Sequence, residues 1–210
     1  MDVRTKNEIH FGLLCPTHKK VANTVIADYP KLKPYKQIFE KFVQQPDYDE
    51  AGFLGMQHNY QGHEKVNALT LYTEHVEEMK KAFKEHELQK AMEHAARALH
   101  FLHDSAIDKH LEKKSIFKEL IDLPGHVAYE GFVHKNFDKL TASYKKKQYK
   151  MQGLKQIFLN NVAVGKTEIK ANKGTQGPWK FKGRRLLHRV LDSTHEFMAN
   201  MTEQMEIYKL

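Results

Sequence analysis

The sequence contains a single cysteine, Cys15, among 210 residues. One cysteine cannot form a disulfide within the chain, so the class of small disulfide-stabilised secreted domains is excluded and nothing indicates an oxidising compartment. No run reaches the roughly 18 apolar residues that a membrane-spanning helix needs. The first fifteen residues hold only the short apolar run 11–15 and no small-residue cleavage pattern, which is not typical of a signal peptide. We therefore expect a soluble, cytoplasmic protein.

Internal repeats are absent, and low-complexity tracts do not go beyond short lysine clusters. The length suits one hydrophobic core, so a single domain over residues 1–210 is expected. Apolar residues recur at spacings of three and four, as in amphipathic helices. This pattern predicts helices over residues 18–28, 34–44, 64–85, 88–103, 126–148, 152–163 and 184–208. Proline, glycine and polar residues predict breaks at 30–34, 45–62, 123–125 and 165–183. The expected fold is all-α, a compact single-domain helical bundle.

Positive charge and histidine are what the sequence has in excess, with a formal net charge of +8 and 14 histidines. Positive charge favours anionic partners such as phosphate groups, nucleic acid or an acidic membrane surface, without choosing among them. The basic clusters at 145–147 and 180–185 are each typical of a solvated surface. Imidazole is the commonest metal ligand in proteins, so the histidines point to metal binding.

Two histidine–carboxylate pairs, each spaced by four residues, lie between residues 98 and 133: His100 with Asp104, and His126 with Glu130. Side chains at i and i+4 share one face of a helix, so each pair can converge on one cation. His110 lies between the two pairs. Imidazole nitrogen and carboxylate oxygen are among the usual ligands of zinc. The stretch therefore predicts a zinc site.

The adjacent residues His103 and Asp104 allow another interpretation. A His-Asp dipeptide is the metal-binding core of HD-type phosphohydrolases, in which case His18 or His58 would be the first ligand. That interpretation leaves the later ligand candidates unexplained, so we favour the paired ligands. The remaining histidines are treated as background: His63, His75, His86, His94, His103, His134, His188 and His195.

Taken in order, these residues resemble the zinc-dependent phospholipase C family, which is related in fold to the zinc-dependent single-strand nucleases. In that family a helix carries His-x-x-x-Asp, a histidine follows six residues later, and another helix carries His-x-x-Tyr/Phe-Glu-x-Phe. The corresponding stretches here are 100–104, His110 and 126–132. The N-terminal half matches as well, with Thr17-His18 near the start of the first helix and Pro-Asp-Tyr-Asp at 46–49, followed by a histidine at 58.

The resemblance implies a helical bundle that holds two or three zinc ions as a metal cluster in a cleft. It implies three ligand sets: His58, His100 and Asp104; His110, His126 and Glu130; and His18 with Asp104 as a bridging carboxylate. Asp47 resembles the acidic residue that sits at the metals, and is both a ligand and the candidate general base.

The chain departs from the family at its start. Secreted members use a processed N-terminal tryptophan as a ligand of the third metal, whereas no tryptophan precedes His18 here. Either trimming exposes a different terminus, or an internal side chain substitutes, or the third metal is absent. The candidate substitutes are His10, Cys15 and Glu8, and we expect His10 because an imidazole replaces an amine nitrogen most directly. Asp108 also stands where the family usually has proline, and the gap from His110 to His126 is a few residues longer than expected.

The expected activity is hydrolysis of a phosphate ester, either a phospholipid or a soluble ester, by metal-activated water. Peripheral contact with a membrane is compatible with this activity, and no nucleic acid is expected as a partner. Two alternatives stay open: a metal-dependent lyase or cyclase of a biosynthetic pathway on the same scaffold, and a non-enzymatic basic helical binding protein. The basic aromatic stretch 179–185 has groups that bind nucleic acid or anionic lipid, although such aromatics are more often packed. Gly165-Lys166-Thr167 lacks the earlier glycine of a P-loop.

Overall fold

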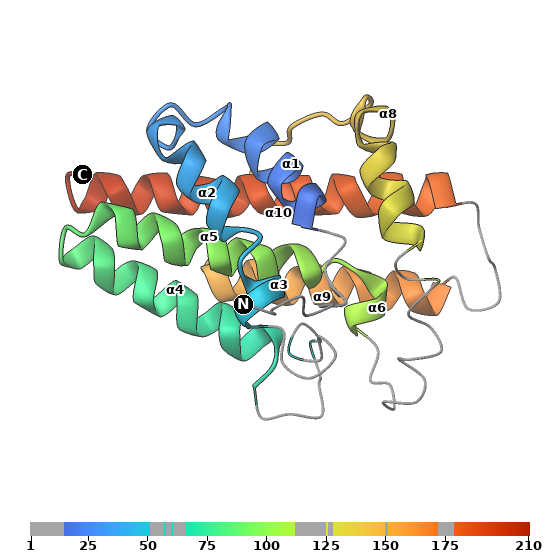
Figure 1. The fold of residues 1–210 in the computed structure, drawn as a ribbon, viewed down its shortest axis with the longest axis horizontal. Coiled ribbons are helices and arrows are strands. Elements are labelled where there is room, and N and C mark those ends of the chain that lie inside the picture. The colour runs from blue at the N-terminus through green and yellow to red at the C-terminus, as the bar shows by residue number, and fades with distance from the viewer. Residues whose placement is uncertain are drawn as a thin grey trace, which may run out of the picture.

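The computed structural model describes residues 15–50, 57, 60, 66–111, 125, 128–149, 151–171 and 179–210. Within these ranges all regular structure is helical and no strand occurs, which confirms the all-α prediction (Figure 1). The helices are α1 (Cys15–Ile26), η1 (Lys33–Tyr35), α2 (Lys36–Phe42), α3 (Pro46–Asp49), α4 (Ala68–Lys84), α5 (Leu88–Asp104), α6 (Asp108–Leu111), α8 (Phe137–Thr141), α9 (Leu154–Ala171) and α10 (Trp179–Ile207). Residues 128–135 are also helical.

Helix α5 is the central element of the bundle. It packs against α4, α2 and α10, while α10 also contacts α1, α8 and α9. In Figure 1 α10 extends along the length of the molecule, with α1 and α8 above it and α9 below it. From Ala95 to Asp104 every residue of α5 except Arg97 is buried. A helix that is buried around its whole circumference lies in the interior, so the C-terminal end of α5 places its polar side chains inside the protein.

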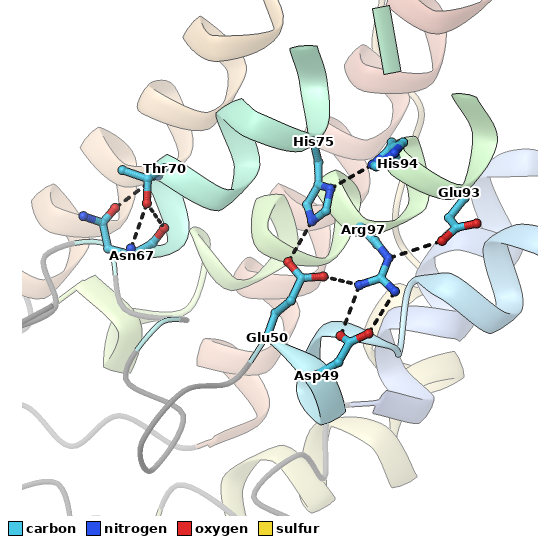
Figure 2. A network of polar contacts seen from close by, with 8 residues as sticks. All are labelled: Asp49, Glu50, Asn67, Thr70, His75, Glu93, His94 and Arg97. Carbon is cyan, nitrogen blue, oxygen red and sulfur yellow. Dashed lines mark hydrogen bonds and ion pairs between the residues drawn. The ribbon is translucent and has the colours of Figure 1, made fainter. Parts of the chain in front are cut away.

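The start of α4 has a local cause. Asn67 is the N-cap, and its Oδ1 accepts hydrogen bonds from the backbone N–H groups of Leu69 and Thr70. The Thr70 hydroxyl oxygen accepts a hydrogen bond from the backbone N–H of Asn67 (Figure 2). This reciprocal capping satisfies N–H groups that have no partner within the helix. The helix therefore begins at Ala68 rather than at residue 64 as predicted.

Other segments also differ from the sequence prediction. The predicted break 45–62 contains the short helix α3. The predicted loop 165–183 is wrong at both ends, because α9 continues to Ala171 and α10 begins at Trp179. A Cβ atom at Gly165 would collide with the side chain of Leu111, so this glycine allows α6 and α9 to pack closely instead of ending a helix. The predicted helix 126–148 ends early, since the residues from 144 to 149 are not helical. None of the helices within the described ranges is long and apolar enough to cross a bilayer.

Candidate metal centre

The centre of interest lies where the C-terminal end of α5 meets α1 and α3. His100 and Asp104 come from α5, His18 from α1 and Asp47 from α3. His18, His100 and Asp104 are buried, with 3%, 0% and 2% of their surface exposed. Ionisable side chains are rarely buried to this degree unless they are paired or bind a metal. The structure therefore brings together four of the predicted ligands from three separate helices.

Asp104 lies between the two imidazoles. Its Oδ1 atom is 3.4 Å from His18 Nε2, and its Oδ2 atom is 3.2 Å from His100 Nε2. Asp47 approaches from the side, with its Oδ1 atom 3.6 Å from His100 Nε2. One ligand atom each from His18, His100 and Asp104 lie within 4.8 Å of one another. Because each oxygen of Asp104 faces a different histidine, its carboxylate has the arrangement of a bridging ligand.

These distances suit zinc. Ligand bonds of about 2.0–2.2 Å in a tetrahedral site place neighbouring ligand atoms about 3.3–3.6 Å apart. The separations between the imidazole nitrogens and the Asp104 oxygens are 3.4 Å and 3.2 Å, within about 0.1 Å of that range. The donor set of imidazole nitrogen and carboxylate oxygen is also of the kind that binds zinc. The residues present therefore fit the metal that the sequence predicts.

A hydrogen bond from Nδ1, the ring nitrogen that faces away from the carboxylates, fixes the orientation of the His100 ring. Its Nδ1–H donates a hydrogen bond of 2.9 Å to the carbonyl oxygen of Val43, which directs Nε2 towards the carboxylates. Burial alone would lower the pKa of His100, but the charges of Asp104 and Asp47 outweigh it and raise the pKa to about 9. In the metal-free protein the protonated ring thus balances the negative carboxylates. A zinc ion held by His100 and Asp104 would supply this balancing charge and would require Nε2 to be deprotonated.

His103 orients the other imidazole, that of His18. The hydroxyl of Thr194 donates its proton to the carbonyl oxygen of Val190 at 2.6 Å, so its oxygen can only accept from His103 Nε2–H at 3.0 Å. Burial and the nearby charge of His100 lower the pKa of His103 to about 3, which keeps its ring neutral with one proton, on Nε2. His103 Nδ1 consequently accepts the proton of His18 Nδ1, 2.9 Å away. His18 Nε2 then presents its lone pair towards Asp104, as a metal ligand requires.

This role contradicts the assignment of His103 to the background. The dipeptide with Asp104 was a visible signal, but the metal-facing group of this part of the protein consists of His18, His100 and Asp104 and does not include His103. Its ring lies parallel to that of His18, with centroids 5.1 Å apart. His103 is therefore better described as a support for a ligand than as the ligand expected in an HD-type site.

The remaining predicted ligands stand as predictions. Glu130 is buried within the helical residues 128–135, and His110 is half-buried on α6. His10, His58 and His126 lie outside the described residues.

A polar network anchors α3, the short helix that carries Asp47 (Figure 2). The guanidinium of Arg97 on α5 pairs with both carboxylate oxygens of Asp49, at 3.1 Å and 2.9 Å, and also with Glu50. Glu50 accepts a second hydrogen bond, of 2.7 Å, from His75 Nε2 on α4, and His75 Nδ1 faces His94 Nδ1 at 3.1 Å. Two histidines assigned to the background thus belong to this network. The network ties the end of α3 to both α4 and α5.

The Glu50 carboxylate is expected to make the free energy of unfolding decrease at acidic pH. Burial alone would raise the pKa of Glu50, but the hydrogen bond from His75 and the charges of His75 and Arg97 lower it below its ordinary value. A carboxyl group with a lowered pKa stabilises the fold above its unfolded-state pKa, and this contribution is lost as the pH falls through its folded-state pKa. Glu50→Gln is expected to lower the free energy of unfolding at neutral pH by about 1–2 kcal/mol, since solvent screens part of the pair.

Urea unfolding measured at steps from about pH 7 to pH 3 tests this expectation. The wild-type protein should lose more stability over the acidic steps than the Glu50→Gln variant. Glu87→Gln, which removes a carboxylate from the surface pair with Lys90, is the matched control and should leave the acid dependence unchanged. Equal acid dependence in wild type and Glu50→Gln would contradict the role given to Glu50.

The fold and the centre together define an all-α protein with a buried histidine–carboxylate site. Comparison with solved structures identifies proteins of similar fold. The alpha-toxin of Clostridium perfringens, from an avian strain, aligns with a TM-score of 0.67 at 13% identity, over 95% of this chain and 64% of the toxin chain. The alpha-toxin of Clostridium absonum aligns with a TM-score of 0.66 at 13% identity, over 93% of this chain and 65% of that chain.

This chain therefore spans about two thirds of the length of the toxins it resembles. The similarity gives it the helical fold of these alpha-toxins, and identity of 13% shows the fold alone. No protein-family model and no curated protein sequence matches the chain.

Proposed function

We propose that the protein is a zinc-dependent phosphoric ester hydrolase whose active centre includes His18, Asp47, His100 and Asp104. The observation that carries the proposal is the Asp104 carboxylate, buried between two imidazoles from different helices at the spacing of zinc ligands. The helical fold shared with the clostridial alpha-toxins supports it. The remaining ligands in this proposal are those of the sequence prediction: His10, His58, His110, His126 and Glu130.

Zinc, when bound, supplies a Lewis acid for the phosphoryl oxygen and lowers the pKa of bound water towards neutrality. The protein residues place and neutralise the ions, because closely spaced dications repel and each carboxylate lowers their summed charge. Asp47 differs from the other three residues, since 12% of its side chain is exposed whereas theirs are almost completely buried. We assign Asp47 as the general base because solvent water can reach its carboxylate.

The proposed substrate is a phosphate ester, either a phospholipid or a soluble ester. A net charge of +8 favours the approach of anionic phosphate groups. Because the centre binds the phosphoryl group, the substrate can be a phosphodiester as well as a phosphomonoester.

The test is metal analysis followed by hydrolysis assays. Protein purified without chelators is expected to contain two or three zinc ions per chain, and to hydrolyse at least one of bis-p-nitrophenyl phosphate, p-nitrophenyl phosphorylcholine and short-chain phosphatidylcholine. Chelation should lower the rate about a hundredfold or more, because metal-ion catalysis supplies several kcal/mol and each 1.36 kcal/mol is tenfold in rate. Added zinc should restore the rate.

Two outcomes would count against the proposal. A chain that contains no zinc would favour the basic binding protein. Full zinc content with no hydrolysis of any ester would favour a lyase or cyclase on the same metals.

A further inference from the structure

We propose that a second binding site, for an organic phosphate, lies between α9 and α10. A pocket of about 420 Å³ opens there, which is within the range of small-molecule sites. We call it the α9–α10 pocket, and its lining includes Arg184, Arg185, His188 and Arg189 from α10 and Asn160 from α9. None of the predicted metal ligands lines it.

The pocket and the metal centre lie on different faces of α10. Ser193 lines the α9–α10 pocket, whereas the next residue, Thr194, contacts His103 beside the metal centre. Figure 1 shows α9 and α1 on opposite sides of α10. The proposed site is therefore independent of the zinc chemistry, and does not rest on the proposed function.

Positive charge in the pocket is only partly balanced. Lys147 at its edge pairs with Asp192, and Arg189 pairs with Glu168 at 2.9 Å. Arg184 and Arg185 form no ion pair or hydrogen bond with any residue in the described ranges, although both line the pocket. The lining thus holds four cationic side chains against the three carboxylates of Glu168, Asp192 and Glu196. The excess positive charge lies on the first half of α10, and an anion is the ligand that would balance it.

Buried nitrogen atoms of two lining residues point to the same ligand. Arg184 Nε and His188 Nε2 are shielded from solvent and have no hydrogen-bond partner within the described part of the chain. These residues are four positions apart in α10, so they share one helix face. A buried polar group without a partner is costly, and a ligand towards which these side chains turn would remove that cost.

The chemistry of the lining favours a phosphate group. Guanidinium groups present several N–H donors in a planar fork that matches phosphate oxygens, and they remain charged at all physiological pH values. The other end of the pocket carries Gln152 and Asn160, whose amides hydrogen-bond each other at 2.8 Å, and the carboxylate of Glu196, which accepts a hydrogen bond from Gln152. A phosphate monoester with a hydroxyl-bearing body, such as a polyol phosphate, satisfies both ends. The ester is either a soluble metabolite or the head group of a phosphoinositide.

Calorimetric titration of the zinc-loaded full chain tests the site with three probes: inorganic phosphate, glucose 6-phosphate and inositol 1,4,5-trisphosphate. Binding of at least one phosphate ester is expected. Arg184→Gln with Arg185→Gln should weaken it about tenfold or more, because the charged hydrogen bonds to the ligand would be lost. Lys180→Gln with Lys182→Gln removes the same charge from the same helix outside the pocket lining, and is expected to change affinity less than about twofold.

Two more variants separate this site from its rivals. Arg184→Lys keeps the charge but loses the buried Nε donor, and is expected to weaken binding. Asp104→Asn alters the metal centre and is expected to leave binding intact. Equal effects of the Arg and Lys double variants would indicate unspecific attraction. Loss of binding in Asp104→Asn would place the phosphate at the metal centre. If no probe binds, the pocket is not a phosphate site. Each of these results overturns the proposal.

Vesicle flotation distinguishes the two sources of the phosphate. Phosphatidylcholine vesicles with and without a phosphoinositide are compared for the wild-type chain and the Arg double variant. Retention on phosphoinositide vesicles alone, lost in the Arg double variant, assigns the site to a lipid head group. Binding of the soluble probe without vesicle retention assigns it to a soluble phosphate ester.

Discussion

Asp104→Asn is expected to remove zinc from the centre and to lower hydrolysis of phosphate esters by about a thousandfold or more. Asp104 is the only residue of the group that faces both His18 and His100, one with each carboxylate oxygen. Asparagine keeps the size but carries no charge, and replaces one oxygen by an amide N–H₂ that cannot coordinate a cation. One of the two imidazoles would then face a donor, and the repulsion between neighbouring dications would be less compensated.

Zinc content per chain and the rate on the best ester of the panel measure this effect. Asp138→Asn is the matched control because Asp138 is exposed on α8, and it is expected to keep full zinc content and activity. Circular dichroism should show a helical protein for both variants, since the hydrophobic core does not include Asp104. If Asp104→Asn keeps its zinc and its rate, this centre is not the active centre.

The sequence predicted the pair His100 and Asp104 because the rule that places them together is local. Residues four apart share a helix face, and the apolar pattern over 88–103 predicted α5 nearly to its observed end. The same rule gave no role to His103, which was assigned to the background. This end of α5 is buried on every side, so His103 contacts His18 on α1 and Thr194 on α10. Periodicity gives the faces of a helix, and tertiary packing decides what each face contacts.

Long-range contacts explain the other differences. His75 and Glu50 are separated by 25 residues, and their hydrogen bond joins the C-cap of α3 to α4, a contact for which the sequence carries no local signal. Gly165 predicted a break because glycine often ends helices, whereas here the missing side chain makes room for Leu111. No local pattern assigned His18 or Asp47, which became candidates through likeness to known families, and the structure places both beside His100.

His103→Leu is expected to lower zinc affinity by about ten- to a hundredfold while the helical fold is kept. Leucine removes the acceptor for His18 Nδ1–H, so the proton of His18 is no longer held on the nitrogen that faces away from Asp104. A fraction of the molecules would then carry the proton on Nε2, where it blocks metal binding. Competition with a chromogenic chelator measures the affinity. His103→Gln supplies an amide oxygen as acceptor and should recover most of it.

The tautomer of His18 provides a readout that loss of packing would not change. In wild-type metal-free protein, ¹⁵N shifts of the His18 ring should report a proton on Nδ1, and in His103→Leu they should report a mixture. Thr194→Val acts one step further away, because it removes the acceptor of His103 Nε2–H, and is expected to change affinity and tautomer in the same direction but less. Weaker zinc binding in His103→Leu without any change in the His18 ring shifts would mean that His103 supports the centre by packing alone. The hydrogen-bonded relay from Val190 through Thr194 and His103 to His18 would then have no part in zinc binding.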